Sequence, residues 1–267
     1  MSEHPEQGTL SDIKLPDELA GRIRVLSMNP PAEALLFPFC DANARAAEQY
    51  RIIRTKILLD RRPLQTVCVS SPQVGDGKSI TALNLAGALA VKLGQSVLLV
   101  DGDFRRSSLA EVLGVESSPG LAGVLAGECG WTEAVGRLDR IPNLYFLPAG
   151  SSKGHPADLF DSPAWGAMCA DLRRCFRSII IDAPPVGMVA DYDLIQACSD
   201  GVVLVVRPDH TLRDLCLKAV EMIPADKLVG VVINMPPVWF LSKGSGRGYL
   251  HYAELSKAAA RAGRNGG

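Results

Sequence analysis

Short runs of apolar residues recur along the chain and alternate with longer amphipathic stretches. Each run has the length of a strand, and it lacks the alternating polar residues of a half-exposed strand. Runs of this kind are typical of strands that are covered on both faces, as in a parallel sheet. The predicted strands lie at residues 67–69, 96–100, 144–147, 178–182, 201–206 and 228–234.

Helical patterns fill the segments between several of these strands. Apolar residues recur at helical spacing over residues 41–60, in a helix that begins at Ser79, and over residues 211–222. A further helical stripe is expected to pack into the core rather than to bind a ligand. Together these patterns predict an α/β fold with a doubly wound, mostly parallel sheet. The stripe consists of Trp165, Met168, Leu172 and Phe176.

The length of 267 residues and the hydrophobic content of 47% fit one α/β domain with irregular ends. Residues 1–40 are rich in Pro, Glu and small polar residues, and we expect an irregular N-terminal arm. Residues 41–238 are expected to form the domain, with short helices broken by glycines over 107–140. Residues 239–267 are predicted to be a flexible tail that carries Tyr249 and Tyr252.

Composition narrows the class of protein further. The formal net charge of −1 does not favour a nucleic-acid-binding protein, so no nucleic-acid partner is expected. The seven cysteines include no C-x-x-C pair, which favours reduced thiols, and the four histidines lack metal-ligand spacing. No apolar run approaches the ~18 residues of a membrane span, and the polar N-terminus does not resemble a signal peptide. We therefore expect a cytoplasmic protein.

The segment from Ser70 to Ser79 predicts a phosphate-binding loop. A buried strand precedes it, it ends in Gly-Lys-Ser, and an apolar helix follows, which is the order that a nucleotide-binding P-loop requires. Lys78 is expected to reach the β- and γ-phosphates, and the Ser79 hydroxyl to bind Mg²⁺. Pro72 stands where the first glycine of the common motif would be, and for the loop alone a glycine-rich turn is the alternative. The residues expected to hold the nucleotide are Gly75, Asp76, Gly77, Lys78, Ser79 and Ile80.

Carboxylates end two of the predicted strands. Asp101 and Asp103 follow the strand at 96–100, and Asp182 ends the strand at 178–182, before a Pro-Pro pair. Ligands of doubly wound sheets bind at the carboxyl ends of the strands, so these side chains are expected beside the nucleotide. The arrangement around Asp182 is that of a Walker B aspartate, which reaches Mg²⁺. For the first pair, a simple Asp-Gly turn is the alternative.

Two other features have two interpretations each, and a third has one. Glu48, Arg51 and Arg54 lie on one side of the first long helix, either as a solvated face or across a subunit boundary. Asn234 ends a strand and either contacts an adenine ring or closes a turn. Asp191 and Asp193 are expected only to cap the helix that runs through Cys198.

Four of these segments, taken in this order, resemble the bacterial tyrosine kinases (BY-kinases), the cytoplasmic autokinases of capsule and exopolysaccharide assembly of the CpsD/CapB type. The likeness covers roughly residues 41–240. The segments are Glu48-x-x-Arg51-x-x-Arg54, the loop through Gly77-Lys78-Ser79, Asp101-Gly102-Asp103-Phe104-Arg105-Arg106, and Ile180-Ile181-Asp182-Ala183-Pro184-Pro185.

The resemblance implies the fold of the partition-type P-loop NTPases, with a deviant Walker motif, and three acidic positions around Mg-ATP. It implies an ATP-dependent protein-tyrosine autokinase that regulates polysaccharide polymerisation and export. Asp101 is then the candidate base for a tyrosine hydroxyl, whereas Asp103 and Asp182 serve the metal together with Ser79. The catalytic candidates are accordingly Lys78, Asp101 and Asp103.

The resemblance also implies partners. The helix of Glu48, Arg51 and Arg54 would pack between subunits of a homo-oligomeric ring, and tyrosines of a neighbour, here Tyr249 and Tyr252, would enter the active site as phosphoacceptors. The chain lacks the two-helix membrane module that is fused to some relatives. A separate membrane-anchored activator, the polysaccharide co-polymerase, is therefore expected to recruit the kinase to the inner face of the membrane.

Departures from the family pattern keep two alternatives open. Family members usually carry a dense C-terminal tyrosine cluster, whereas this tail has two tyrosines, which would suit an ATP-binding oligomeric switch or scaffold with little kinase activity. A partition-type ATPase is the second alternative. Those proteins usually have a second lysine early in the loop, and neither Gln73 nor Val74 provides one.

Overall fold

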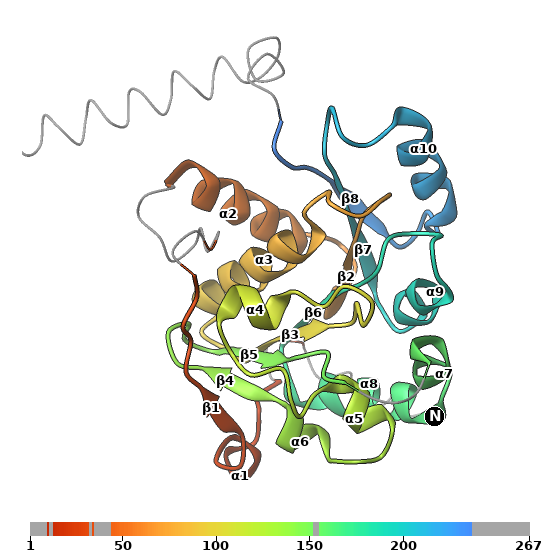
Figure 1. Ribbon diagram of the computed structural model, residues 1–267. Coiled ribbons are helices and arrows are strands. Elements are labelled where there is room, and N and C mark those ends of the chain that lie inside the picture. Colours follow the sequence, from red (N-terminus) through yellow and green to blue (C-terminus); the bar gives the residue numbers. More distant parts are fainter. Residues whose placement is uncertain (1–9, 11–12, 32–33, 35–43, 152–154, 237–267) are drawn as a thin grey trace, which may run out of the picture.

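Eight strands in the described part of the chain form one sheet in the order β1-β4-β5-β3-β6-β2-β7-β8 (Figure 1). The computed structural model describes residues 10, 13–31, 34, 44–151 and 155–236. All strand pairs are parallel except β4 with β5, so the predicted mostly parallel α/β sheet is confirmed. The strands are β1 (Arg24–Leu26), β2 (Thr66–Ser70), β3 (Val97–Asp101), β4 (Gly136–Leu138), β5 (Leu144–Leu147), β6 (Ser178–Asp182), β7 (Gly201–Val206) and β8 (Leu228–Ile233).

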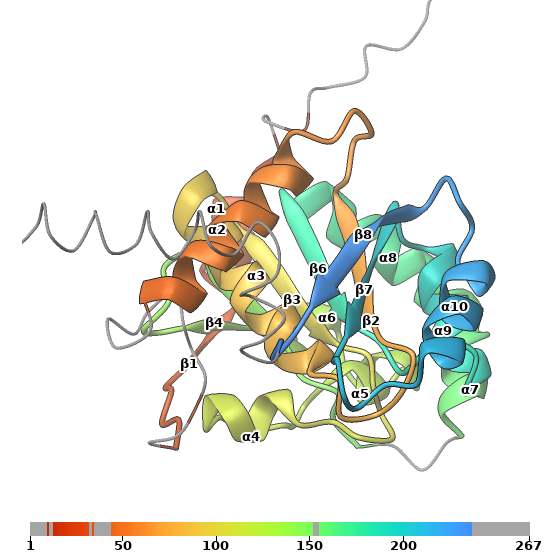
Figure 2. The same ribbon diagram turned by 90° about the horizontal axis from the view of Figure 1, so that it is seen from above.

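Helices cover both faces of this sheet, as a doubly wound fold requires. Figure 2 shows α2 and α3 on one side and α8, α9 and α10 on the other. The central strands β2, β3, β5 and β6 are buried along their whole length, which explains why their sequences are continuously apolar. The helices are α1 (Asp17–Ala20), α2 (Ala44–Leu58), α3 (Lys78–Leu93), α4 (Leu109–Leu113), α5 (Leu121–Leu125), α6 (Trp131–Ala134), α7 (Pro156–Phe160), α8 (Pro163–Cys175), α9 (Ala190–Ala197) and α10 (Arg213–Met222).

Each face of the sheet has its own hydrophobic core. The core beneath α2, α3 and α4 includes Ile57, Leu85 and Leu109, whereas the opposite core holds the predicted stripe of α8. All four side chains of that stripe are buried, as the helical spacing predicted. The short helices expected over residues 107–140 are present as α4, α5 and α6, but the strand β4 at the end of this segment was not predicted.

The N-terminal segment differs from the irregular arm that the sequence suggested. Residues 17–20 form α1, and β1 pairs in parallel with β4 at one edge of the sheet. Ile23, Leu26 and Met28 are buried, and the guanidinium of Arg24 donates to the backbone carbonyl of Ser118 at 3.2 Å. A three-residue edge strand is too short to give a recognisable pattern in the sequence. Its pairing partner β4 is also distant along the chain, so no local signal connects the two strands.

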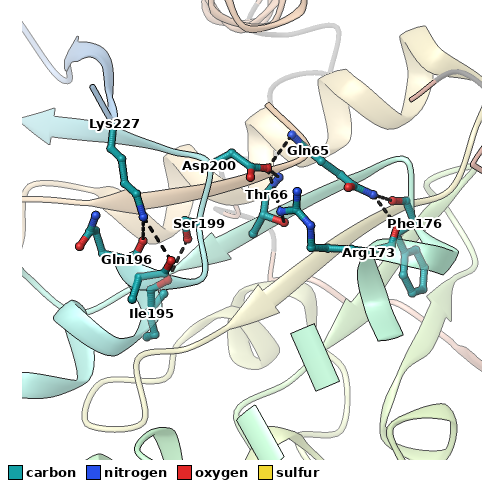
Figure 3. A network of polar contacts seen from close by, with 10 residues as sticks. Gln65, Thr66, Arg173, Phe176, Ile195, Gln196, Ser199, Asp200 and Lys227 are labelled. Atoms are coloured by element: carbon teal, nitrogen blue, oxygen red, sulfur yellow. Dashed lines mark hydrogen bonds and ion pairs between the residues drawn. The ribbon is translucent and has the colours of Figure 1, made fainter. Parts of the chain in front are cut away.

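A polar network at the amino ends of β2 and β7 connects these strands to α8 (Figure 3). One oxygen of Asp200 accepts hydrogen bonds from the backbone N–H groups of Gln65 and Thr66, at 3.0 and 2.7 Å. The same oxygen lies 2.9 Å from the guanidinium of Arg173 on α8. The network lies at the opposite end of the sheet from Asp101 and Asp182, so it supports the fold rather than the candidate site. Within the described residues, no helix is both long and apolar enough to cross a membrane.

Candidate active site

The predicted phosphate loop connects β2 to α3. Gly75 and Gly77 both have a φ of 91°, a left-handed conformation that favours glycine. At Gly77 a side chain is also excluded by space, because a Cβ atom there would lie 2.1 Å from the Nδ2 atom of Asn234. α3 begins at Lys78, so the backbone N–H groups of its first turn are oriented toward the loop. Pro72, which replaces the first glycine of the common motif, is buried at the start of the loop.

The loop is held by residues that follow β7 and β8. The buried carboxylate of Asp76 accepts hydrogen bonds from the backbone N–H of Gln73, at 3.3 Å, and from the hydroxyl of Thr211. The side-chain amide of Asn234 donates to the backbone carbonyl of Asp76 at 2.8 Å. His210 lies with its Nε2 atom 3.0 Å from the carbonyl of Val74. Sequence reasoning missed Thr211 and His210, because no motif connects them to the loop.

Lys78 lies at the centre of a buried acidic cluster. Its ammonium group is 2.8 Å from Oδ2 of Asp103, 3.2 Å from Oδ1 of Asp182 and 3.3 Å from the Ser79 hydroxyl oxygen. Burial opposes the charged form of Lys78, but the carboxylates of Asp182 and Asp103 outweigh it and raise its pKa. The structure therefore brings together the residues that the sequence predicted for the phosphates and the metal.

Asp101 is the third carboxylate of this cluster. It is the register neighbour of Asp182 across β3 and β6, and it is completely buried. Neither of its carboxylate oxygens has a hydrogen-bond partner of ordinary geometry among the described residues. Burial, reinforced by the nearby charge of Asp182, raises the pKa of Asp101 to about 8. Burial likewise raises the pKa of Asp182, although Lys78 opposes this.

The charge balance of the cluster fits a divalent cation. Three carboxyl groups face one ammonium group in a buried region, and Oδ2 of Asp182 as well as both oxygens of Asp101 lack a hydrogen-bond partner in the described chain. Unpaired carboxylate oxygens beside a hydroxyl form the hard oxygen donor set that Mg²⁺ prefers. The donors of the loop and of the first turn of α3 suit the phosphates of a nucleotide.

The predicted oligomer residues lie on α2, apart from this cluster. Glu48 and Arg51 form an exposed ion pair of 2.7 Å, whereas Arg54 donates to the backbone carbonyl of Ala88 in α3 at 3.3 Å. The three residues therefore differ in their contacts. Arg54 attaches α2 to α3 of the same domain, whereas the side chains of Glu48 and Arg51 are exposed to solvent. Ile80 is half-buried in the first turn of α3.

Asp191 and Asp193 do not cap α9. The helix is capped by Val189, which makes no side-chain capping bond, and Asp193 is exposed. Asp191 is instead 1% exposed, and its Oδ2 atom accepts a hydrogen bond of 3.2 Å from Nε of Arg105. The spacing in sequence gave no sign of this contact, because Arg105 follows a different strand.

The candidate phosphoacceptors Tyr249 and Tyr252 lie outside the described residues. The chain has five tyrosines in all. Tyr50, Tyr145 and Tyr192 are 7%, 7% and 1% exposed, so their hydroxyl groups are not presented to a kinase in the folded domain.

The fold and the site together define a P-loop nucleotide-binding protein of the partition-ATPase type. Its topology resembles a septum site-determining protein MinD from Pyrococcus horikoshii, solved with Mg-ADP, with a TM-score of 0.55, 25% identity and coverage of 63% of this chain and 69% of MinD. The crystal structure of the chimerical protein CapA2B2 is more similar, with a TM-score of 0.72, 27% identity and coverage of 83% and 99% of the two chains.

Sequence relatives identify the family. The tyrosine-protein kinase YwqD of Bacillus subtilis is 33% identical over 208 residues, which are 76% of this chain and 85% of YwqD. The succinoglycan biosynthesis transport protein ExoP of Rhizobium meliloti is 30% identical over 188 residues, 68% of this chain but only 23% of ExoP. No protein-family model matches the chain. The chain belongs to the bacterial tyrosine-protein kinases, and it is an enzyme of that class.

Proposed function

We propose that this protein is an ATP-dependent protein-tyrosine autokinase that regulates the polymerisation and export of an exopolysaccharide or capsule. The observation that carries the proposal is the contact of Lys78 with Asp103 and Asp182 at the end of a phosphate loop, beside the unpaired Asp101. Phosphoryl transfer consists largely of positioning and charge neutralisation, so these groups suffice for it.

ATP would be bound through the loop and the first turn of α3. The backbone N–H groups around Gly75, Gly77 and Ser79 suit the phosphates, and the positive N-terminus of α3 favours their charge. Lys78 would exchange its two carboxylate contacts for contacts with the β- and γ-phosphates. Asn234 supports the same loop through the carbonyl of Asp76.

Ser79, Asp103 and Asp182 would hold Mg²⁺. When bound, the metal neutralises charge on the phosphates during transfer. Asp103 and Asp182 are both in contact with Lys78 in the structure, so they are already within reach of one shared position. Their oxygen donors, together with a serine hydroxyl, match the ligands that Mg²⁺ selects.

Asp101 would accept the proton of the tyrosine hydroxyl. Once it is ionised, a carboxylate whose pKa burial has raised to about 8 is a stronger proton acceptor than an exposed aspartate, and both oxygens of Asp101 lack hydrogen-bond partners of ordinary geometry among the described residues. The side chain is completely buried, so the proton transfer requires that a bound acceptor gain access to it. Tyr249 and Tyr252 are the proposed acceptors, since the other three tyrosines are buried.

The partners are part of the proposal. Glu48 and Arg51 would contact a neighbouring subunit in a homo-oligomeric ring, because their ion pair is exposed on α2. A separate membrane-anchored activator of the polysaccharide machinery would recruit the kinase to the inner face of the membrane. The relative ExoP is named a biosynthesis transport protein, which supports this setting.

The test is phosphotyrosine mapping by mass spectrometry after incubation with Mg-ATP. We expect phosphate on Tyr249 or Tyr252, and its loss in Lys78→Met, which removes the cation from the phosphate site. Phosphotyrosine that persists in purified Lys78→Met would contradict the mechanism.

A scaffold with little kinase activity is the second candidate, and it is supported by the small number of candidate acceptors, because three of the five tyrosines are buried. The double variant Tyr249→Phe, Tyr252→Phe separates the two. Unchanged polysaccharide output in cells would favour the scaffold, whereas altered output would favour the autokinase.

A further inference from the structure

Two loops that carry the acidic cluster are joined by one ion pair outside it. Arg105 lies in the loop after β3, two residues beyond Asp103, and Asp191 lies in the first turn of α9, beyond the Pro-Pro segment that follows Asp182. The Nε atom of Arg105 is 3.2 Å from Oδ2 of Asp191. This contact connects the two segments directly.

The burial of the two partners is unequal. The side chain of Asp191 is 1% exposed, and that of Arg105 is 41% exposed. The second carboxylate oxygen of Asp191 is buried and has no hydrogen-bond partner in the described part of the chain. Arg105 is therefore the one cation that this buried carboxylate contacts among the described residues. Because Asp191 is buried and Arg105 is partly exposed, the carboxylate restricts the position of the guanidinium more than the guanidinium restricts the carboxylate.

Besides the contact of Asp103 with the ammonium group of Lys78, at 2.8 Å, the loop between Asp101 and Arg106 has few other attachments. The backbone N–H of Gly102 donates to the carbonyl of Asp182 at 2.8 Å, and that of Arg106 donates to Oδ1 of Asp103 at 3.1 Å. The first bond fixes where the loop begins, and the second fixes its local turn. Phe104 stacks on Phe160 with ring centroids 4.9 Å apart. Of these contacts, the ion pair alone ties the loop to the segment that follows Asp182.

We propose that Asp191 is a positioning residue for the Mg²⁺ ligand Asp103, acting through the guanidinium of Arg105. The proposal rests on the metal site described under the proposed function. A carboxylate that binds a metal needs its direction fixed by surrounding groups, and small displacements weaken the site. With Arg105 attached to α9, the oxygens of Asp103 and Asp182 stay in reach of one cation.

The test compares Asp191→Asn with the matched control Asp193→Asn in the full-length protein. Asp193 lies in the same first turn of α9 but is exposed, so its change alters the charge of the helix and leaves Arg105 in place. Arg105→Gln is the second variant, because its half-exposed side chain can be changed without opening the core. ADP affinity is measured by calorimetry with and without MgCl₂, and thermal unfolding reports folding.

In Asp191→Asn and Arg105→Gln we expect the Mg²⁺ concentration for half-maximal enhancement of ADP binding to rise about tenfold. ADP affinity without Mg²⁺ should stay within twofold of the parent protein, and the double variant should add little to either single change. Asp193→Asn should have the same Mg²⁺ dependence and the same ADP affinity as the parent protein.

If Asp191→Asn and Arg105→Gln showed the same Mg²⁺ dependence of ADP binding as Asp193→Asn, the proposal would be overturned. Equal losses of ADP affinity with and without Mg²⁺, which indicate a general structural role, would also overturn it. These measurements need no tyrosine transfer. A parent protein that binds Mg-ADP but yields no phosphotyrosine would contradict the autokinase and leave this test intact.

Discussion

The amide nitrogen of Asn234 lies 2.8 Å from the backbone carbonyl oxygen of Asp76, so the end of β8 holds the phosphate loop from outside. The same amide fills the space that a side chain on Gly77 would need. This contact gives Asn234 a role in the site that does not depend on an adenine ring.

Asn234→Ala should therefore weaken binding of ADP and of inorganic pyrophosphate to a similar extent, about fivefold, as expected for one lost hydrogen bond of about 1 kcal/mol. Calorimetry with the two ligands provides the comparison. If ADP alone were weakened, the side chain would act on the base, and support of the loop would be the wrong explanation.

The raised pKa of Asp101 predicts how stability depends on pH. In the folded protein this group keeps its proton up to about pH 8, whereas the ordinary value is 3.8. The folded state thus binds the proton more tightly, so the stabilisation is complete below about pH 4 and is lost as pH rises toward 8. Asp101→Asn has no titrating group at this position, so the variant should not lose this stability as the pH rises.

Relative to the parent, nucleotide-free Asp101→Asn should gain up to roughly 4 kcal/mol of unfolding free energy between pH 5 and pH 8, at about 1.4 kcal/mol per pH unit. Urea unfolding at the two pH values measures it. Parallel pH profiles for the variant and the parent would show that folding does not raise the pKa of Asp101, and the increased proton affinity proposed for this group would be wrong.

The edge strand β1 should contribute measurably to stability. Leu26 is 5% exposed and packs against Gly136, whereas its neighbour Val25 is 52% exposed. Leu26→Ala should lower the free energy of unfolding by about 2–4 kcal/mol, because it leaves a cavity, and Val25→Ala should change it by less than about 0.5 kcal/mol. Chemical denaturation of both variants tests this. Equal, small effects would mean that residues 24–26 do not pair with β4 in solution.

Charge reversal on α2 tests the proposed ring. Arg51→Glu should reduce the oligomer mass measured by light scattering, while its thermal stability stays close to that of the parent, because exposed pairs such as Glu48–Arg51 contribute about 0.5 kcal/mol. Lys56→Glu makes the same change of charge at another exposed position of α2 and should assemble normally. An Arg51→Glu protein with the parent's mass would place the subunit boundary elsewhere.

The sequence predicted those parts of the fold and site whose information is local. Continuous apolar strands, the Gly-Lys-Ser loop and the aspartates at strand ends can each be recognised within a few residues, and the structure contains all of them. One expectation was wrong: β8 is an edge strand rather than a strand covered on both faces, and its Val231 and Ile233 are about half exposed. β1 and β4 were missed because each has three residues and is stabilised by a partner far away in the chain. Thr211, His210 and Asp191 were missed for the same reason, since each acts on a loop that follows a different strand.

The hydrogen bond from Asn234 to the loop also determines where the last segment of the chain starts. Pro236 follows two residues later, and Tyr249 lies thirteen positions beyond it, a contour of at most about 45 Å at roughly 3.5 Å per residue. In the proposed ring, the tail of a neighbouring subunit is tethered to the assembly in the same way, so its tyrosine is present at an effective concentration on the order of millimolar. Covalent attachment can thus take the place of a substrate-docking groove, and a weak intrinsic affinity for the tyrosine side chain is enough for phosphorylation.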